Sequence, residues 1–520
     1  MSLKTLIVLL FVVAIIRKSS AQDTTVIIHS ANRLRLENQW LNTNNAAGQV
    51  FNPFTSDGDF VLGYTSKKGD LKLSQLSPDE QIYSFNTNKS VRLNDFVFSG
   101  YVGYQNVEQE EVGWTARMNP VTLNPYMLAD SLFGLYKKDY VFLGGGFGYQ
   151  ISDRLIAGIH ADYSVGNGAR IKDPRPQNHV FELEVFPSVI YAFDNLKLGA
   201  NLRFLTGREK TKYTTLRNST TYRFFRMFGL GKAPRAVNGW SYTRNYYLTG
   251  LGGELQAQYS LGKIKILSSL GYFNQVEESE DGSANPRKFD AGDFHENKYS
   301  FYTVVNYGRK LLHSALVRVD FLDAEGIEFL QEEYAVNDVT YYRTIAERTN
   351  YSLQQITPSF SYTLAKPYNQ YSNSWEIGLD VSMDHFNAEY LLEAEETYTN
   401  IEGSIDLAKY FYFNNNMLVF SASGTLNYNL ENSLRQLRTY TASQEVAIWE
   451  NIIEPDFILT TSNVYDLGAS IRYGQSLAIV KDVKNLIYLE LGVNYSSGNN
   501  DLWPQSKDFE KYCLKIGLNY

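Results

Sequence analysis

The sequence has almost no cysteine and, after its first residues, no long apolar run. Its 520 residues include one cysteine, Cys513, so no disulfide can form within the chain, and an oxidising compartment would be tolerated without being used. Beyond residue 21 no stretch is apolar for the length that a membrane-spanning helix needs, about 18–20 residues. If the chain enters a membrane, it must therefore do so as strands.

Recognisable catalytic and metal-binding motifs are also missing. Six histidines are present, but the chain contains no HExxH pattern, no histidines four residues apart, no paired cysteines and no GxSxG elbow. Hydrolytic and metal chemistry need a base or ligands at fixed spacing, so we expect no enzyme, no metal and no cofactor. A hydrolase whose Ser/His pair is assembled across barrel strands is a remote alternative.

Basic residues are scarcer than acidic ones. The chain has 48 Lys and Arg against 56 Asp and Glu, a formal net charge of −8. The first 21 residues contain Lys4, Arg17 and Lys18 and no acid, so the remainder has 45 basic against 56 acidic residues, or −11. A chain this acidic is a poor candidate for general nucleic-acid binding.

Residues 1–21 predict a secretory signal peptide. Lys4 gives a charged start, residues 6–16 form an apolar run too short to span a bilayer, and Ser19-Ser20-Ala21 is a small-residue cleavage site. No cysteine follows the apolar run, which excludes a lipid anchor at that site. We expect cleavage and a mature chain that begins at Gln22.

The C-terminal residues 509–520 predict a membrane strand. Every second residue there is large and apolar, namely Tyr512, Leu514, Ile516, Leu518 and Tyr520. The residues between them are small or polar, so one face would meet lipid and the other a wet lumen, with Tyr520 in the interfacial aromatic girdle. The pattern resembles the C-terminal signal that the barrel-insertion machinery recognises. We therefore expect these five residues to form a membrane-assembly signal.

Alternating strands continue through most of the chain. Beyond Tyr140 they are separated by short polar turns, such as Ser152-Asp153 and Asp194-Asn195. The connections on the opposite side are expected to be long, at 166–180, 208–240, 275–298, 323–350, 388–398, 431–459 and 496–508. Short periplasmic turns and long extracellular loops are typical of outer-membrane barrels.

The fold class predicted is all-β, a transmembrane antiparallel β-barrel. Counting back from Tyr520 gives about 15 strands from Tyr140 onward, and an N-terminus in the periplasm requires an even total, so we predict about 16 strands, with roughly 14 or 18 if the early pieces are misjudged. Residues 91–520 would form the barrel. Residues 22–90 would form a periplasmic lead-in or lumen segment with early strands in it, because the pieces between residues 60 and 85 fit either the wall or an inner hairpin.

One stretch, residues 208–235, is strongly basic. Its cations, against Glu209 alone, are Arg208, Lys210, Lys212, Arg217, Arg223, Arg226, Lys232 and Arg235. Three interpretations stay open. The stretch could pair with acidic neighbouring loops or with lipopolysaccharide phosphates at the rim. It could fold inward, narrow the pore and favour anions. It could also dock a partner.

Two further stretches, 125–134 and 169–178, do not look like generic loops. The second contains Asp173, Pro174, Arg175 and Pro176, whose prolines stiffen a rigid interaction loop that either pins itself to the rim or recognises a partner. With the export signal, the strand at Phe96 and the glycine-rich strand after Tyr140, these stretches resemble a family of Bacteroidota outer-membrane β-barrels of unassigned function. The resemblance implies the cell outer membrane and a loose association with TonB-dependent uptake or other envelope complexes. It supplies no catalytic or ligand residues.

These observations predict a non-enzymatic outer-membrane protein, either a porin-like channel or an accessory subunit of an envelope uptake or assembly complex. The expected partners are outer-membrane lipid and lipopolysaccharide, the barrel-insertion machinery, and a TonB-dependent transporter or other envelope proteins. A secreted soluble β-rich binding protein is the alternative. Lys197, Asn201, Arg203, Arg318 and Asp320 are expected to face the lumen, but polar residues there fit an open or a plugged lumen equally.

Overall fold

The computed structural model describes residues 33, 36–216, 221–234, 236–239, 241–282, 288–369, 372–436, 442–480, 483–500, 502 and 506–520. The expected signal peptide, residues 1–21, lies outside these residues.

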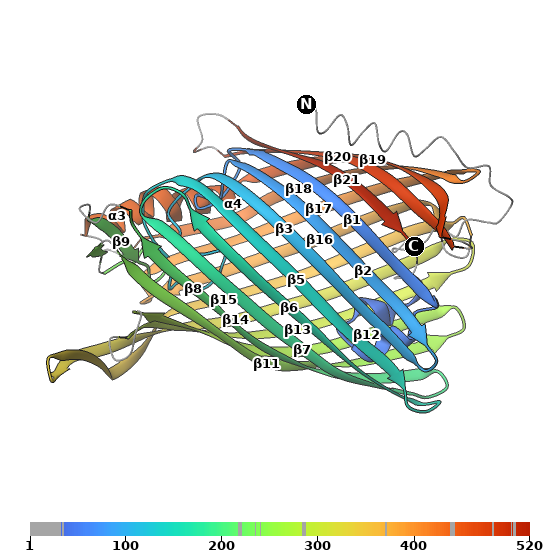
Figure 1. Ribbon diagram of the computed structural model, residues 1–520, viewed down its shortest axis with the longest axis horizontal. Helices are drawn as coiled ribbons and strands as arrows, with labels where there is room; N and C mark the ends of the chain where they lie inside the picture. Colours follow the sequence, from blue (N-terminus) through green and yellow to red (C-terminus); the bar gives the residue numbers. More distant parts are fainter. Residues whose placement is uncertain are drawn as a thin grey trace.

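Within these described residues, eighteen antiparallel strands form one closed sheet (Figure 1). The strands are β1 (Ser56–Gly69), β2 (Asp79–Leu93), β3 (Phe96–Val112), β5 (Gly134–Gln150), β6 (Leu155–Arg170), β7 (Arg175–Ala192), β8 (Leu196–Thr214), β11 (Tyr242–Leu261), β12 (Ile264–Asp281), β13 (Phe289–Gly308), β14 (Leu312–Val336), β15 (Val339–Pro367), β16 (Asn373–Tyr390), β17 (Ala394–Phe413), β18 (Asn416–Arg435), β19 (Asn463–Val480), β20 (Val483–Asn499) and β21 (Lys507–Asn519). The first and last strands pair from Asp59 with Asn519 to Gly69 with Phe509. This pairing closes the barrel and removes the open edges that a flat sheet would expose.

The strand count is 18 rather than the favoured 16. The expected strands after Tyr140 are all present, as β5 to β8 and β11 to β21. The difference lies at the N-terminal side, where β1 pairs with both β2 and β21 and is therefore part of the wall. The early strands expected within residues 22–90 belong to the barrel, and the wall begins at Ser56.

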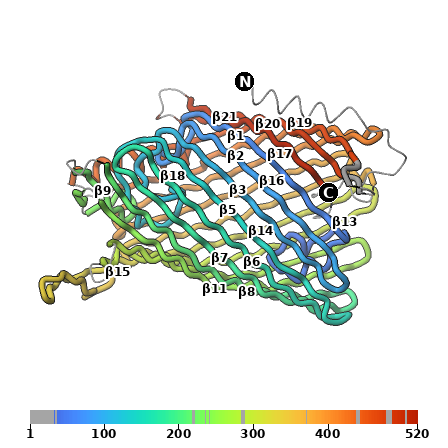
Figure 2. The backbone as a smooth tube through the Cα atoms, in the orientation of Figure 1, coloured from blue at the N-terminus to red at the C-terminus, as the bar shows by residue number. Residues whose placement is uncertain are grey.

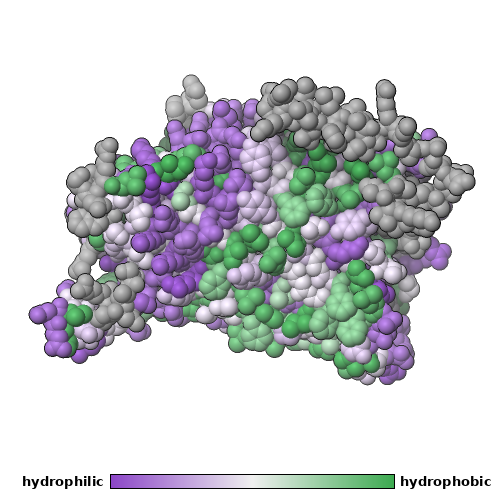
Figure 3. Space-filling view, in the orientation of Figure 1, coloured by the Kyte–Doolittle hydropathy of each residue, from purple (hydrophilic) through white to green (hydrophobic). Residues whose placement is uncertain are grey.

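The alternation of side chains confirms the register. On β8, Leu198, Leu202 and Phe204 are exposed on the outer face, whereas Asn201 is buried against Gln256 on the lumen side. Hydrophobic residues gather over the middle and right of the face drawn in Figure 3, and hydrophilic residues over its left part. An apolar outer belt with a polar interior is the pattern of a barrel solvated by lipid.

The C-terminal strand has the same alternation. Leu514 pairs with Leu491 and Ile516 with Leu489 on the outer face, while Lys515 lies inside and its Nζ is 2.9 Å from Glu490 Oε1. Tyr512 and Tyr520 are exposed. Of the five residues expected to form an assembly signal, Tyr512, Leu514, Ile516 and Leu518 therefore share the outer face of β21, and Tyr520 directly follows the strand.

The two ends of the barrel differ. One end, here called the turn end, has the short connections such as 151–154 and 262–263. The other, the loop end, has residues 113–133, the segment between β8 and β11, and the segment between β18 and β19. Figure 2 shows the helical turns η1 (Gln39–Asn42) and η2 (Ala46–Phe51), in blue, inside the barrel outline near the turn end.

Several stretches expected as long loops are strands. Residues 166–180 fall almost wholly in β6 and β7. Residues 323–350 form the ends of β14 and β15, which turn at Asn337-Asp338. Their outer part, residues 328–350, extends past the last pairings with β13 and β16 as a projecting hairpin (Figure 1).

Among the described residues, no helix has both the length and the hydrophobicity required to cross a membrane.

The register predicts which face tolerates charge. Leu202→Arg places a cation on the lipid face near mid-strand, where it costs about 2–4 kcal/mol, and should impair folding into lipid vesicles. Ser470→Arg, which faces a polar lumen cavity, is the matched control and should fold almost normally. Folding is measured by heat-dependent gel mobility and urea titration. Equal impairment of both variants would contradict the assigned faces, because a one-residue slip exchanges them.

Candidate functional site

The most unusual feature of the barrel is a segment that folds into its loop end. Residues 113–133, here called the inner segment, connect β3 to β5 and include the short strand β4 (Leu128–Ala129). Most of its side chains are buried, among them Trp114, Arg117 and Tyr126. A buried connection must find partners for its backbone polar groups. Here part of that need is met internally, since Trp114 N donates to Asp130 O and Ala116 N to Leu128 O.

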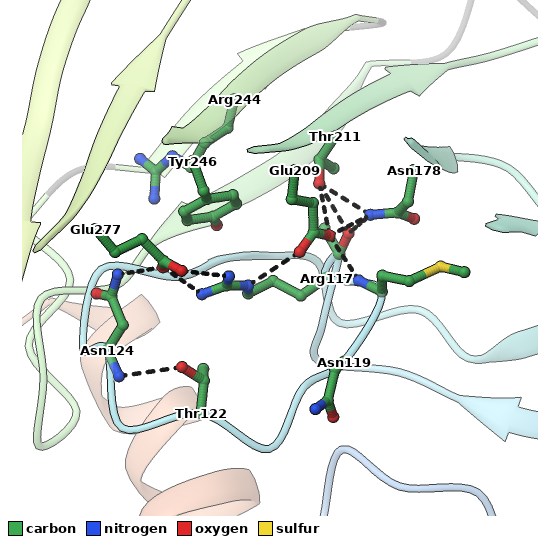
Figure 4. Close-up of polar contacts among 12 residues, drawn as sticks. Arg117, Asn119, Thr122, Asn124, Asn178, Glu209, Thr211, Arg244, Tyr246 and Glu277 are labelled. Atoms are coloured by element: carbon green, nitrogen blue, oxygen red, sulfur yellow. Dashed lines mark hydrogen bonds and ion pairs between the residues drawn. The ribbon is translucent and has the colours of Figure 1, made fainter. Parts of the chain in front are cut away.

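Arg117 ties the inner segment to two strands of the wall (Figure 4). Its Nη1 and Nη2 donate to the two carboxylate oxygens of Glu277 on β12, at 2.7 and 3.0 Å, and its Nε lies 3.4 Å from Glu209 Oε2 on β8. Burial alone would lower the pKa of the guanidinium, but the two carboxylates hold it above its ordinary value. Paired, forked contacts of this kind are strong and directional.

Glu209 is the centre of these contacts around Arg117, here called the Arg117 clamp. Its Oε1 accepts the backbone N–H of Met118 at 2.6 Å and the Asn178 side chain at 2.8 Å (Figure 4). Asn178 also donates to Ala116 O at 2.6 Å. The only acid in the basic stretch therefore faces the lumen and holds the inner segment.

A second ion pair holds the far end of the inner segment. Asp130 Oδ2 lies 2.7 Å from Arg170 Nη2 at the end of β6, with side chains only 2% and 0% exposed. Tyr213 donates to the same carboxylate, and Arg170 also donates to Pro174 O. A single charge buried this deeply would be very unfavourable, so each residue's charge compensates the burial of the other.

Tyr126 anchors the middle of the segment by packing. It is fully buried and belongs to a cluster with Leu230, Phe294 and Tyr351. A side chain at Gly292 or Gly326 would collide with its ring or hydroxyl, since an added Cβ would lie 2.5 Å and 2.7 Å from them. Gly292 also has φ +141, a conformation that favours glycine. These glycines make room for the tyrosine.

A cap covers the inner segment at the loop end. β4 continues into a three-stranded sheet with β9 (Tyr222–Arg226) and β10 (Ala236–Gly239). Above it lie the cap helices, α3 (Ser443–Ile448), the π-helical turn η3 (Trp449–Ile453) and α4 (Glu454–Thr460), visible beside β9 in Figure 1. Their apolar side chains form one cluster with the inner segment, which includes Trp114, Ala129, Phe225, Met227, Ala233, Ile448 and Ile452.

The N-terminal segment, residues 36–55, occupies the turn end. It contains η1 (Gln39–Asn42) and η2 (Ala46–Phe51). Trp40 is buried and donates to Gln258 at 2.9 Å, while the Gln39 side chain donates to the carbonyls of Lys265 and Val304. A Cβ at Gly158 would lie 2.4 Å from Ala47 N, so this close approach requires a glycine in the wall.

Beside these fillings the lumen keeps a polar cavity of about 830 Å³ along β16 to β21. Its charged lining residues are Asp59, Glu376, Asp380, Asp406, Glu490, Arg472, Lys511 and Lys515. Acids outnumber bases by two among these described residues, so the cavity is mildly acidic.

The structure divides the basic stretch 208–235 into two parts. Arg208, Lys210 and Lys212 lie on β8 and point outward, on the same face as Leu202, so they do not line the lumen. Arg223, Arg226 and Lys232 lie in the cap. Arg226 Nε is 3.0 Å from Asp281, Lys232 Nζ is 2.7 Å from Glu445, and Arg223 donates to Gln444 at 2.8 Å. Arg217 and Arg235 lie outside the described residues.

The Asp173–Pro176 stretch spans the end of a short turn and the start of β7, rather than lying in a long loop. Asp173 pairs with Arg175 at 2.7 Å and accepts the N–H of Leu216. Pro176 already lies in β7, opposite Tyr213. Through Arg170, which donates to Pro174 O, the turn is tied to the inner segment.

Sequence reasoning missed Arg117 and Glu277 as a pair, because residues 160 apart in the chain carry no local signal of contact. It noted 125–134 as unusual, which is the half of the inner segment that contains Tyr126 and Asp130. Among the described residues, no group of three or more His, Cys, Asp or Glu side chains is placed to hold a metal ion.

The Arg117 clamp can be tested by how accessible a thiol introduced at residue 118 is to a labelling reagent. In a Cys513→Ser background, Met118→Cys should resist a membrane-impermeant maleimide, because residue 118 is buried in the clamp. Adding Arg117→Met leaves Glu209 and Glu277 without their cation, a loss of about 3–5 kcal/mol for a buried pair, and should expose the introduced thiol to rapid labelling. Lys137→Met, which breaks an exposed pair with Glu108, is the control and should not. Equal labelling rates in all three would rule out the clamp.

Asp456 gives the cap a pH dependence. Burial raises the pKa of its carboxyl to about 6, although Ser74, whose N–H it accepts, and Lys72 and Lys507 act in the opposite direction. A raised folded-state pKa means that the folded cap binds this proton more readily. The free energy of unfolding therefore rises as pH falls through about 6 toward the ordinary value of 3.8. Above pH 6 the carboxyl is ionised in the folded protein, and the full cost of burying that charge is present.

We expect Asp456→Asn to stabilise the protein at about pH 7.5 by on the order of 3 kcal/mol and to have much less effect at about pH 4. The measurement is the thermal midpoint followed by intrinsic fluorescence. Asp338→Asn, at the exposed tip of the projecting hairpin, is the control. If wild type and Asp456→Asn differ equally at both pH values, the buried carboxyl is not the cause.

Comparisons with known proteins give one family match and several distant structural likenesses. No curated protein matches the chain. Solved structures with a similar barrel include the ferric preacinetobactin receptor BauA from Acinetobacter baumannii, at 9% identity and TM-score 0.38 over 89% of this chain and 80% of that one. The outer membrane transporter YddB from Escherichia coli is 9% identical, with a TM-score of 0.37 over 89% of this chain and 81% of that one. The toluene transporter TodX from Pseudomonas putida is 11% identical, with a TM-score of 0.29 over 94% of each chain.

At such identities and TM-scores these likenesses carry no argument. The family comparison is different in kind, because its match extends from residue 46 to residue 520. The chain therefore belongs to DUF6850, a family of unknown function.

Proposed function

We propose that this protein is a non-enzymatic outer-membrane barrel that its own chain holds closed, and that it acts as an accessory subunit of an envelope uptake or assembly complex. The observation that carries this proposal is the inner segment, buried at the loop end and tied to the wall by Arg117. Chain packed into both ends of the lumen would obstruct the path of solutes through a free-diffusion pore.

The outer face supports the placement in a membrane. Exposed residues such as Leu202, Leu255 and Leu270 form an apolar belt that water would not tolerate as a continuous surface. With an export signal at residues 1–21, the turn end faces the periplasm and the loop end the exterior. The C-terminal strand then serves the insertion machinery, and lipid and lipopolysaccharide surround the wall.

The partner is an envelope protein, such as a TonB-dependent transporter. Two surfaces at the loop end are available to it. The projecting hairpin of β14 and β15 exposes apolar side chains, including Leu330, Tyr334 and Ile345. Lys210 and Lys212 are exposed on the outer face of β8, where they can also meet lipopolysaccharide phosphates.

A gated channel is the second candidate, and the polar cavity along β16 to β21 favours it. A passage through this cavity would be lined by more acids than bases. It would favour cations, the opposite of the anion preference that the basic stretch would give if it lined the pore.

Planar-bilayer conductance, combined with gentle purification from native membranes, tests the proposal. We expect wild-type protein to give no lasting porin-type conductance and to co-purify with a constant envelope partner. If the partner is absent and Arg117→Met opens a cation-selective conductance, the gated channel is correct instead. Frequent open-channel currents from the wild type would contradict closure. Release of the protein from membranes by alkali would contradict the barrel's place in the membrane.

A further inference from the structure

The polar cavity along β16 to β21 carries charges of both signs, and the two signs lie on different strands. β16 and β17 form its acidic side, with Glu376, Asp380 and Asp406. β19 and β21 form its basic side, with Arg472, Lys511 and Lys515. β18, which separates the two sides, contributes only uncharged lining residues. This separation fits a solute that carries a positive group at one end and a negative group at the other.

Two further acids line the cavity, and neither neutralises Lys511. Glu490 on β20 is engaged by the other two bases, since its Oε2 lies 2.6 Å from Arg472 Nε and its Oε1 2.9 Å from Lys515 Nζ. Asp59 on β1 pairs with Asn519, at the turn end of β21 and eight residues along the strand from Lys511. The Lys511 ammonium group forms no hydrogen bond or ion pair with any residue that the structure describes.

Strand pairing places Asp406 and Lys511 in one row across the lumen face. Asp406 of β17 pairs with Ser423 of β18, which pairs with Gly468 of β19. Gly468 pairs with Asn494 of β20, which pairs with Lys511 of β21. All five residues line the cavity. Four strand intervals of about 4.8 Å separate the two charged residues by about 19 Å along the wall.

The middle of this row is polar and kept open by a glycine. A Cβ at Gly468 would collide with the Ser423 hydroxyl and would lie 2.6 Å from Asn494 Nδ2, so both side chains reach over this position. In the described part of the chain, neither side chain has a hydrogen-bond partner. A hydroxyl and an amide can both donate and accept hydrogen bonds, which suits the backbone of a peptide lying along the row.

Asp380 and Asp406 form the acidic end of the row. Asp406 pairs with Gly378, two residues from Asp380 on β16, so the two acids are diagonal neighbours on one face. Asp406 is exposed to the cavity, and Asp380 is half-buried. Neither carboxylate forms a hydrogen bond or an ion pair within the described ranges. An ammonium group placed between them would form charge-assisted hydrogen bonds with both.

The basic end of the row has a second lysine beside it. Lys511 lies directly opposite Lys67 of β1, whose Nζ is 2.6 Å from Glu80 Oε1. Like charges directly opposite each other in a sheet are unfavourable. A carboxylate bound at Lys511 would reduce this repulsion, so this end of the row fits the negative end of a solute.

We propose that this cavity binds a short peptide with free ends, its ammonium group at Asp380 and Asp406 and its carboxylate at Lys511. Three or four extended residues span about 10–14 Å, and the side chains of Asp406 and Lys511 reach across the remainder of the row. The volume of about 830 Å³ lies in the range of small-molecule sites.

The peptide enters from the turn end, because the lining of the cavity extends to Tyr412, Met417 and Asn519 there. None of the lining residues belongs to the N-terminal segment, residues 36–55, which packs on β3 and on β5 to β7. The inference rests on the proposed function only in assigning the turn end to the periplasm.

Isothermal titration of the full-length protein in detergent tests the site, with tetra-alanine as the probe. We expect saturable binding of the peptide with both ends free. Acetylation of its amino end or amidation of its carboxyl end should each weaken binding at least about tenfold, because each removes hydrogen bonds between charged groups.

Variants connect each end of the peptide to its residues. Lys511→Gln should weaken binding of free tetra-alanine at least about tenfold, and amidation of the peptide should then cause no further loss. The double variant Asp380→Asn with Asp406→Asn should be insensitive to acetylation in the same way. A change that only disturbed the structure would not cancel the effect of one blocking group and retain that of the other. Lys212→Gln, on the outer face of β8, is the control and should bind like the wild type.

Four outcomes would overturn the proposal. They are absence of saturable binding, equal binding of the peptide blocked at both ends, an equal loss in Lys212→Gln, or a loss on amidation that persists unchanged in Lys511→Gln. Heat-dependent gel mobility shows whether each variant is folded, and if one is not, the blocked peptides decide the matter on the wild type. Because calorimetry requires neither conductance nor a partner, failure here is distinguishable from failure of the proposed function.

Discussion

Closing an 18-stranded sheet leaves a lumen too wide for the side chains of its own wall to fill, and most of the structure follows from how the chain occupies that space. At the turn end, Trp40 and the turns around it pack against wall residues near the turn-end termini of several strands, including Ile156, Ile190 and Leu267. At the loop end, the inner segment, the β9–β10 hairpin and the cap helices do the same. Each filling brings backbone groups away from water, so each depends on polar side chains of the wall for hydrogen bonds.

At the loop end this need is met in part by buried ion pairs, and at the turn end by hydrogen bonds from amide side chains and from Arg92, which donates to Val50 O and Asn52 O. Gln39, Gln258 and Asn45 hold the N-terminal segment through amide hydrogen bonds. Arg117 and Asp130 hold the inner segment through buried ion pairs. A buried ion pair adds little net stability compared with an apolar contact, but it is specific, because separating it leaves charges without partners. These ion pairs therefore favour one seated position of the inner segment over alternative ones.

The sequence was sufficient where structure is local. The alternation in β21 and in the strands after Tyr140 gave the fold class, the register and nearly all of the turns, because a strand with one face in lipid and one in water has period two. It was insufficient for β1 and β2, since only the pairing of β1 with β21, across more than 400 residues of chain, shows that they belong to the wall. The clamp could not be predicted for the same reason. One signal was available but overlooked, because Arg208, Lys210 and Lys212 alternate with Glu209, Thr211 and Tyr213 as a strand requires.

The central claim is that the inner segment is an integral part of the folded barrel. Hydrogen–deuterium exchange of the protein in lipid nanodiscs, read by mass spectrometry, compares it with the wall directly. The amides of Trp114, Ala116 and Met118, which donate to Asp130, Leu128 and Glu209, should exchange as slowly as those of β6 and β12. The projecting hairpin, residues 328–350, should exchange much faster. If residues 113–133 exchange as fast as that hairpin, the segment does not close the barrel and the account is wrong.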